Sequence, residues 1–237
     1  MKKLLLGLVA LGAANSAMAA DMAFKAAPVM PVENWSWQGL YIGAHFGSLW
    51  GTKDITMSSA GTDINQSQTQ INGYLGGGQI GYNYQIGRWV IGGEFQSSWS
   101  NADGTGQCNI VSINNCNVRV DWLGTAAGRV GWMIDHALVF VKAGGAWAHD
   151  KYLTNTLGNS LTTATASESR SGGMFGTGVE YAFTPNWSAK IEYDFLDLGT
   201  KNITFNNAAA AAIVGSVPIQ ERIHLIKFGV NYRLGWF

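Results

Sequence analysis

Four histidines are the side chains of this sequence best suited to catalysis or cofactor binding. His149 lies two positions after Trp147, and an accessible imidazole beside an apolar wall is what a haem iron requires of an axial ligand. His149 is therefore a candidate haem ligand, and the alternative is an ordinary interfacial histidine. We find no grouping of serine, histidine and carboxylate typical of a hydrolase, and no metal or nucleotide signature. The sequence predicts neither enzymatic activity nor a resident cofactor.

The two cysteines, Cys108 and Cys116, are separated by seven residues in a polar stretch. In an oxidising compartment such a pair forms a local disulfide, worth roughly 2.5 kcal/mol in the chain-entropy model. A metal site is the alternative, but no histidine lies near them in the sequence. We predict a disulfide between Cys108 and Cys116.

Charged side chains alternate with apolar ones in segments that read as β-strands. In the fourth segment Val118, Val120 and Trp122 share one face, while Arg119 and Asp121 share the other. The eight segments are residues 37–50, 73–84, 89–99, 118–132, 138–149, 173–183, 187–195 and 222–234.

The polarity of the two faces distinguishes a closed barrel from a soluble sandwich. If the charged faces met water, the aromatic faces of all eight segments would have to share one core, which their rings would overfill. An eight-stranded antiparallel transmembrane β-barrel instead turns the aromatic face to lipid and the charged face to a narrow lumen. The charges assigned to the lumen are Glu94, Arg119, Asp121, Arg129, Lys142, Glu180, Lys190, Glu192, Asp194, Lys227 and Arg233. An ion-paired plug is favoured, and a narrow pore is the alternative.

Aromatic residues recur ten positions apart on one face of a segment, as in Trp89 and Trp99. Ten residues tilted by about 40° rise roughly 25 Å, the height between the two aromatic girdles of such barrels. The residues assigned to the girdles are Tyr74, Tyr84, Trp89, Trp99, Trp122, Trp132, Trp147 and Trp187.

The beginning of the chain resembles an export signal. Lys2 and Lys3 precede a short apolar run that ends in small residues, which predicts a signal peptide at 1–19, a periplasmic lead-in at 20–34 and the barrel at 35–237. Connections alternate in length, and short turns face the periplasm in this architecture. The short ones are 85–88, 133–137 and 184–186, and the long, extracellular ones are about 51–72, 100–117, 150–172 and 199–221.

The composition fits strands that face lipid. The chain has 31 Gly and 10 Trp, and its 13% of charged residues is about half the usual share for a soluble domain. Without the two lysines of the signal peptide, 13 basic residues stand against 15 acidic ones, a net charge of −2. This balance does not suggest a nucleic-acid partner.

Three motifs carry a resemblance to a known family: residues 37–43 (WQGLYIG), 76–84 (GGGQIGYNY) and 227–233 (KFGVNYR). They resemble the "porin family" outer-membrane β-barrel proteins of Gram-negative bacteria, a group with major surface antigens and some haemin-binding members. The resemblance implies location in the outer membrane, contact with its lipid and lipopolysaccharide, and insertion by the barrel-assembly machinery. Phe237 resembles the C-terminal aromatic signal of that machinery.

The leading functional expectation is a non-enzymatic surface barrel that supports envelope integrity and displays extracellular loops. Two alternatives remain: a narrow channel for ions or small solutes, and a haemin-binding receptor. A host surface ligand is a further possible partner.

Overall fold

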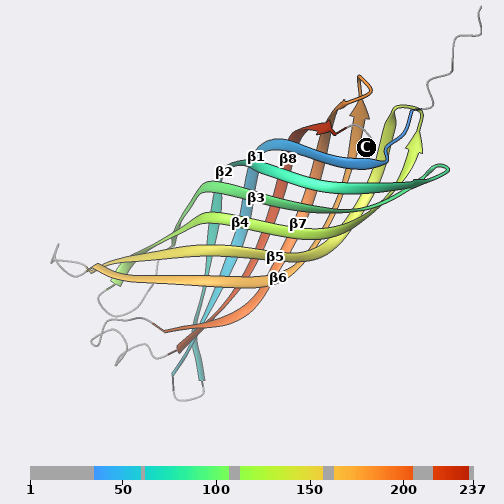
Figure 1. Ribbon diagram of the computed structural model, residues 1–237. Coiled ribbons are helices and arrows are strands. Elements are labelled where there is room, and N and C mark those ends of the chain that lie inside the picture. Colours follow the sequence, from blue (N-terminus) through green and yellow to red (C-terminus); the bar gives the residue numbers. More distant parts are fainter. Residues whose placement is uncertain (1–34, 60–61, 107–112, 157–162, 205–215, 235–237) are drawn as a thin grey trace, which may run out of the picture. The chain divides into compact units, whose positions relative to one another are not determined.

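The computed structural model describes residues 35–59, 62–106, 113–156, 163–204 and 216–234. Eight antiparallel strands each pair with their chain neighbours, and β1 also pairs with β8, which closes the barrel (Figure 1). The predicted fold class is thereby confirmed. The strands are β1 (Gly39–Ser59), β2 (Thr62–Ile86), β3 (Trp89–Gly106), β4 (Ile113–Ile134), β5 (Ala137–Thr156), β6 (Thr163–Ala182), β7 (Trp187–Thr204) and β8 (Ser216–Arg233).

Large apolar side chains point outward from every strand. Tyr74 and Trp99 are the most exposed of them, at 72% and 70% of their surface, and Trp122 is half-buried where its indole donates a hydrogen bond to Ser97. Such an apolar exterior is unfavourable in water and favourable in lipid. The closed barrel also pairs the backbone groups of every strand, which a structure that crosses the bilayer requires. All eight residues assigned to the girdles lie on this outward face.

The strands continue well past the ends expected from the sequence. Residues 51–59 of β1 and 62–72 of β2, both expected in a loop, form one antiparallel ladder from Gly51↔Ile71 to Ser59↔Thr62. The same extension occurs in the other three long connections. In these segments serine, threonine and glutamine residues occupy both odd and even positions, so the alternation of apolar and polar residues that predicts a strand is lost. The backbone hydrogen bonds that form a ladder do not depend on side-chain polarity.

A shift in pairing register near the outer end of β4 reverses the expected faces. Between Val120 and Trp122 the register against β5 slips by one residue, so Asp121 has no direct partner. An extra residue moves every following side chain to the other face. Val120 is consequently buried inside the barrel, whereas Arg119 and Asp121 lie outside it, contrary to their predicted place in the lumen.

Inward-facing glycines allow neighbouring strands to approach closely, and Gly172 with Gly173 on β6 offers a matched test. A Cβ added at Gly172 would lie 2.0 Å from the carbonyl oxygen of Asp197, whereas one added at Gly173 meets nothing within 4 Å. We expect Gly172→Ala to lower the free energy of unfolding by about 1–3 kcal/mol and Gly173→Ala to leave it nearly unchanged. Urea unfolding of the refolded variants measures both, and equal stability would contradict the backbone approach.

Several predictions lie outside the described residues. They are the signal peptide, the lead-in at 20–34, the terminal Phe237 and Cys108 of the expected disulfide. The described part of the chain contains no helix with the length and hydropathy needed to cross a bilayer.

Candidate functional site: a layered barrel interior

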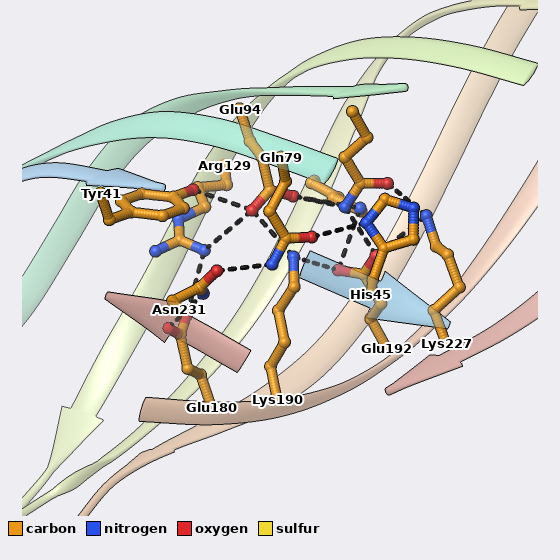
Figure 2. A network of polar contacts seen from close by, with 12 residues as sticks. Tyr41, His45, Gln79, Glu94, Arg129, Glu180, Lys190, Glu192, Lys227 and Asn231 are labelled. Carbon is orange, nitrogen blue, oxygen red and sulfur yellow. Dashed lines mark hydrogen bonds and ion pairs between the residues drawn. The ribbon is translucent and has the colours of Figure 1, made fainter. Parts of the chain in front are cut away.

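The barrel interior contains a neutral layer of eight charged side chains at the level of the membrane. Figure 2 shows part of it, around Glu94, Arg129 and Lys190. Four cations and four anions project from β3 to β8, and every one is buried. They are Arg129, Lys142, Lys190 and Lys227, with Glu94, Glu180, Glu192 and Asp194. Buried charges are tolerated when they are paired and hydrogen-bonded, so we call this set the inner charge layer.

Glu94 is the hub of the inner charge layer. Its carboxylate lies 2.8 Å from Lys190 Nζ, 3.5 Å from Lys142 Nζ and 3.7 Å from Arg129 Nη1, and it accepts a 2.8 Å hydrogen bond from the Tyr41 hydroxyl. These contacts join strands β1, β3, β4, β5 and β7 through one side chain. The arrangement can fix the positions of strands around the barrel.

The other carboxylates share the remaining cations. Glu192 lies 2.9 Å from Lys227 and 3.1 Å from Lys142, and Asp194 lies 2.6 Å from Lys227. Glu180 pairs with Arg129 at 3.2 Å. Each of these four ion pairs joins two different strands, so the layer cross-links the wall from within.

Neutral polar side chains complete this layer. The imidazole of His45 contacts Gln79 at 3.0 Å through Nδ1 and Ser98 at 2.7 Å through Nε2, and all three side chains are buried. Asn231 donates a 2.7 Å hydrogen bond to Glu180. Inward parity on β1 predicts the place of His45 in the lumen from the sequence alone, whereas Gln79, Ser98 and Asn231 were not assigned to the site.

An apolar layer lies above the inner charge layer, toward the extracellular side. The order of inward residues along β1 shows the sequence of layers: Tyr41 and His45 first, then Leu49, then Lys53. Thirteen buried apolar residues from all eight strands form this layer: Leu49, Ile71, Leu75, Ala102, Val120, Leu123, Ala146, Ala148, Met174, Leu196, Leu198, Ile223 and Leu225. Charges inside the barrel are thus divided into two separate groups.

A second neutral charge group, the outer tetrad, lies above the apolar layer and consists of Lys53, Asp150, Arg170 and Glu221. Lys53 Nζ lies 2.9 Å from Asp150 and 3.1 Å from Glu221, while Arg170 Nε lies 3.4 Å and 3.5 Å from the same two carboxylates. All four side chains are buried. The tetrad joins β1, β5, β6 and β8 where these strands leave the membrane.

The outer tetrad should make stability depend on pH. Glu221 lies three residues outward of His224, which stacks on Trp50, an exposed aromatic residue near Tyr74 of the girdle, and is therefore beyond the membrane span. Burial raises the pKa of Glu221 to about 7; Lys53 and Arg170 oppose that rise, and Asp150 adds to it. Because the folded pKa exceeds the ordinary value, stability from this group is complete below about pH 4.5 and is lost as the pH rises through 7.

Urea unfolding between pH 4.5 and 8 should show this loss, at up to roughly 1.4 kcal/mol per pH unit. Glu221→Gln cannot titrate and should flatten that part of the profile. An unchanged slope in Glu221→Gln would assign the pH dependence to other groups.

The periplasmic end of the barrel is covered by a small apolar cluster. Trp37 is buried with Val90, Leu138 and Ala182, and its backbone N–H donates a 2.6 Å hydrogen bond to Gln85. The half-buried guanidinium of Arg233 stacks over Trp37, 5.5 Å from the ring centre. Arg233, which was assigned to the lumen, therefore lies at its periplasmic mouth, below the inner charge layer.

His149 lies on the outside of the barrel rather than in the lumen. Its Nδ1 is 3.2 Å from the hydroxyl of Ser169 and its Nε2 is 3.0 Å from that of Ser167. Both ring nitrogens are occupied, so binding to a haem iron would require one of these contacts to break. The haem assignment stays a prediction, which haemin titration of wild type and His149→Ala would check. No group of three potential metal ligands occurs among the described residues.

A closed eight-stranded barrel with a lipid-compatible exterior and an ion-paired interior defines a bacterial outer-membrane β-barrel. A family model described as "Outer membrane protein beta-barrel domain" matches residues 6–217. The chain belongs to this family, and its place is the outer membrane.

Relatives and solved structures agree with this assignment. The chain is 30% identical over 246 residues to a 31 kDa outer-membrane immunogenic protein of Brucella melitensis, which covers 98% of this chain and all of the relative. It is 29% identical to a 22 kDa outer membrane protein of Rhizobium leguminosarum, over 77% of this chain and 74% of the relative. OprG from Pseudomonas aeruginosa has the same fold, with a TM-score of 0.52, 10% identity and coverage of 83% and 98%.

Proposed function

We propose that this protein is a non-enzymatic, sealed surface barrel that supports the integrity of the outer membrane and displays its outer strands and loops. The apolar layer carries this proposal. It separates two neutral charge groups, so the polar side chains of the lumen make no continuous path across the membrane. Eight strands leave little room beyond the side chains themselves.

Display to the outside is supported by the length of the strands. β1 and β2 run about nine residues beyond Trp50, which at 3.3 Å per residue projects a paired rim well past the outer girdle. Relatives of this chain, among them the 31 kDa protein of Brucella melitensis, are named outer-membrane immunogenic proteins, which is in keeping with an exposed surface.

Labelling of single cysteines on intact cells tests the display. With Cys108 and Cys116 replaced by serine, Ser167→Cys should react with a membrane-impermeant thiol reagent on whole cells. Arg88→Cys, exposed in the β2–β3 turn, should react only after lysis. The reverse pattern would overturn the proposed orientation.

Loss of the gene tests the role in envelope integrity. A deletion strain should become more sensitive to bile-salt detergents, and wild-type protein should restore resistance. Glu221→Gln leaves the strands and the apolar layer unchanged, so this variant should restore detergent resistance as well. Unchanged sensitivity in the deletion strain would remove this part of the proposal.

A further inference from the structure

The register shift in β4 creates a charged group on the outside of the barrel. The carboxylate of Asp121 forms ion pairs with Arg119 Nε at 3.0 Å and with Lys151 Nζ at 2.6 Å, and these hold the two cations close together. Arg119 and Lys151 are 55% and 57% exposed, and they face each other directly across β4 and β5. Without the shift, Arg119 and Asp121 would point into the lumen.

An open depression of about 490 Å³ lies beside this group, within the size range of small-ligand sites. It is lined by Trp122, Trp147, Ala148, His149, Ser169 and Arg170. The Trp122 ring lies against Gly124 and the Trp147 ring against Gly145, and both glycines are on the membrane side of their tryptophans. Each indole therefore folds toward the bilayer centre and gives the depression apolar walls.

The depth of the two features matches the two ends of a lipid. Trp122 and Trp147 belong to the outer girdle, where acyl chains meet headgroups. Lys151 lies two residues further out than His149, about 7 Å along the strand, which is the headgroup level. Cations at headgroup level beside an apolar depression fit a phosphorylated amphiphile.

We propose that Arg119, Lys151 and the adjoining depression bind a phosphorylated glycolipid of the lipid A class in the outer leaflet. The guanidinium and ammonium groups hold one phosphate by charge-assisted hydrogen bonds, and an acyl chain lies between the two indoles. Lys201, whose Nζ donates a 2.8 Å hydrogen bond to the carbonyl of Ser169, adds a third positive charge at the edge of the site.

Two carboxylates limit the charge of this site. Asp121 bridges the two cations, and the exposed Asp103 of β3 lies directly across from Arg119. Asp121 positions the cations, so its loss should disorder them. By contrast, Asp103 repels a bound phosphate by its negative charge, so Asp103→Asn should strengthen binding.

Native mass spectrometry of the detergent-solubilised barrel can count retained lipid. We expect retention of bis-phosphorylated lipid A, and a loss of about tenfold or more in the Arg119→Gln/Lys151→Gln double variant, since two charged contacts are removed. Trp147→Ala should also weaken retention, and Asp103→Asn should increase it. The matched control is Arg222→Gln, which removes an exposed cation 3.9 Å from Asp197 on the β7–β8 side and should change nothing.

Competing probes identify the source of the phosphate. Dephosphorylated lipid A and phosphatidylglycerol should be retained poorly, and inorganic phosphate should not displace lipid A. Equal retention of phosphatidylglycerol, displacement by phosphate alone, or an equal loss in Arg222→Gln would each overturn the proposal. Unchanged retention in the double variant would overturn it as well, provided that its gel mobility before and after boiling matches the folded wild type.

Discussion

The Glu94→Leu variant should unfold with a free energy about 3–5 kcal/mol below that of wild type, because it strands buried cations without their shared carboxylate. Lys190, Lys142 and Arg129 all lie within 3.7 Å of Glu94. Four cations would then face three anions in a lumen closed to bulk water on both sides. Leucine fills similar space but accepts no hydrogen bond, so the Tyr41 hydroxyl also loses its acceptor.

Equilibrium unfolding in urea, on protein refolded into lipid vesicles, measures this loss. Arg129→Leu should be similarly costly, since it leaves Glu180 without its cation and removes the guanidinium packed 4.8 Å from the centre of the Tyr41 ring. Ile191→Leu on the lipid-facing side is the control and should change stability little. If Glu94→Leu does not fold, Glu94→Gln gives a milder form of the same measurement. Wild-type stability in both Glu94→Leu and Arg129→Leu would show that the inner charge layer does not hold the barrel together.

The membrane-embedded part of the barrel could be predicted from the sequence because its two faces meet such different surroundings. Outward residues contact lipid and inward ones contact other side chains, so alternation on β7 is strict, with Lys190, Glu192 and Asp194 inside. A one-residue slip anywhere in that stretch would place a charge in hydrocarbon. The same constraint explains why the girdle residues could be assigned to the outside.

Alternation loses this force where the strands leave the membrane. In β4, the apolar residues Val120 and Leu123 are three positions apart, and a regular strand places such a pair on opposite faces. This pair was the available signal for a change of register, but the sequence does not say which side of Trp122 the change falls on. The structure places it at Asp121, so Leu123 and Val120 both join the apolar layer.

The outer tetrad could not be predicted, because its members are far apart in the chain and lie in segments that resemble loops. Lys53 and Asp150 are separated by 97 positions, and only closure of the barrel brings them to 2.9 Å. The apolar layer was missed for a related reason. Leu49, Leu225 and Ile223 point inward from strands whose other inward residues are polar. That they lie at the same level of the barrel follows only from the pairing register of β1 and β8.

Planar bilayers that contain the refolded protein should show no stable single-channel steps, and the layered interior explains why. An ion that passed the inner charge layer would have to cross the apolar layer without water, and moving a charge into such surroundings is strongly unfavourable. Leu49 and Leu225 face each other across β1 and β8 in the middle of this layer, and both are buried. Glu94→Leu should therefore lose stability without gaining current, because its substitution leaves the apolar layer intact. A general porin in the same bilayers verifies that channels are detected. Reproducible steps from wild type would favour a narrow channel, and steps that appear only in Glu94→Leu would make the inner charge layer a gate rather than a structural cross-link.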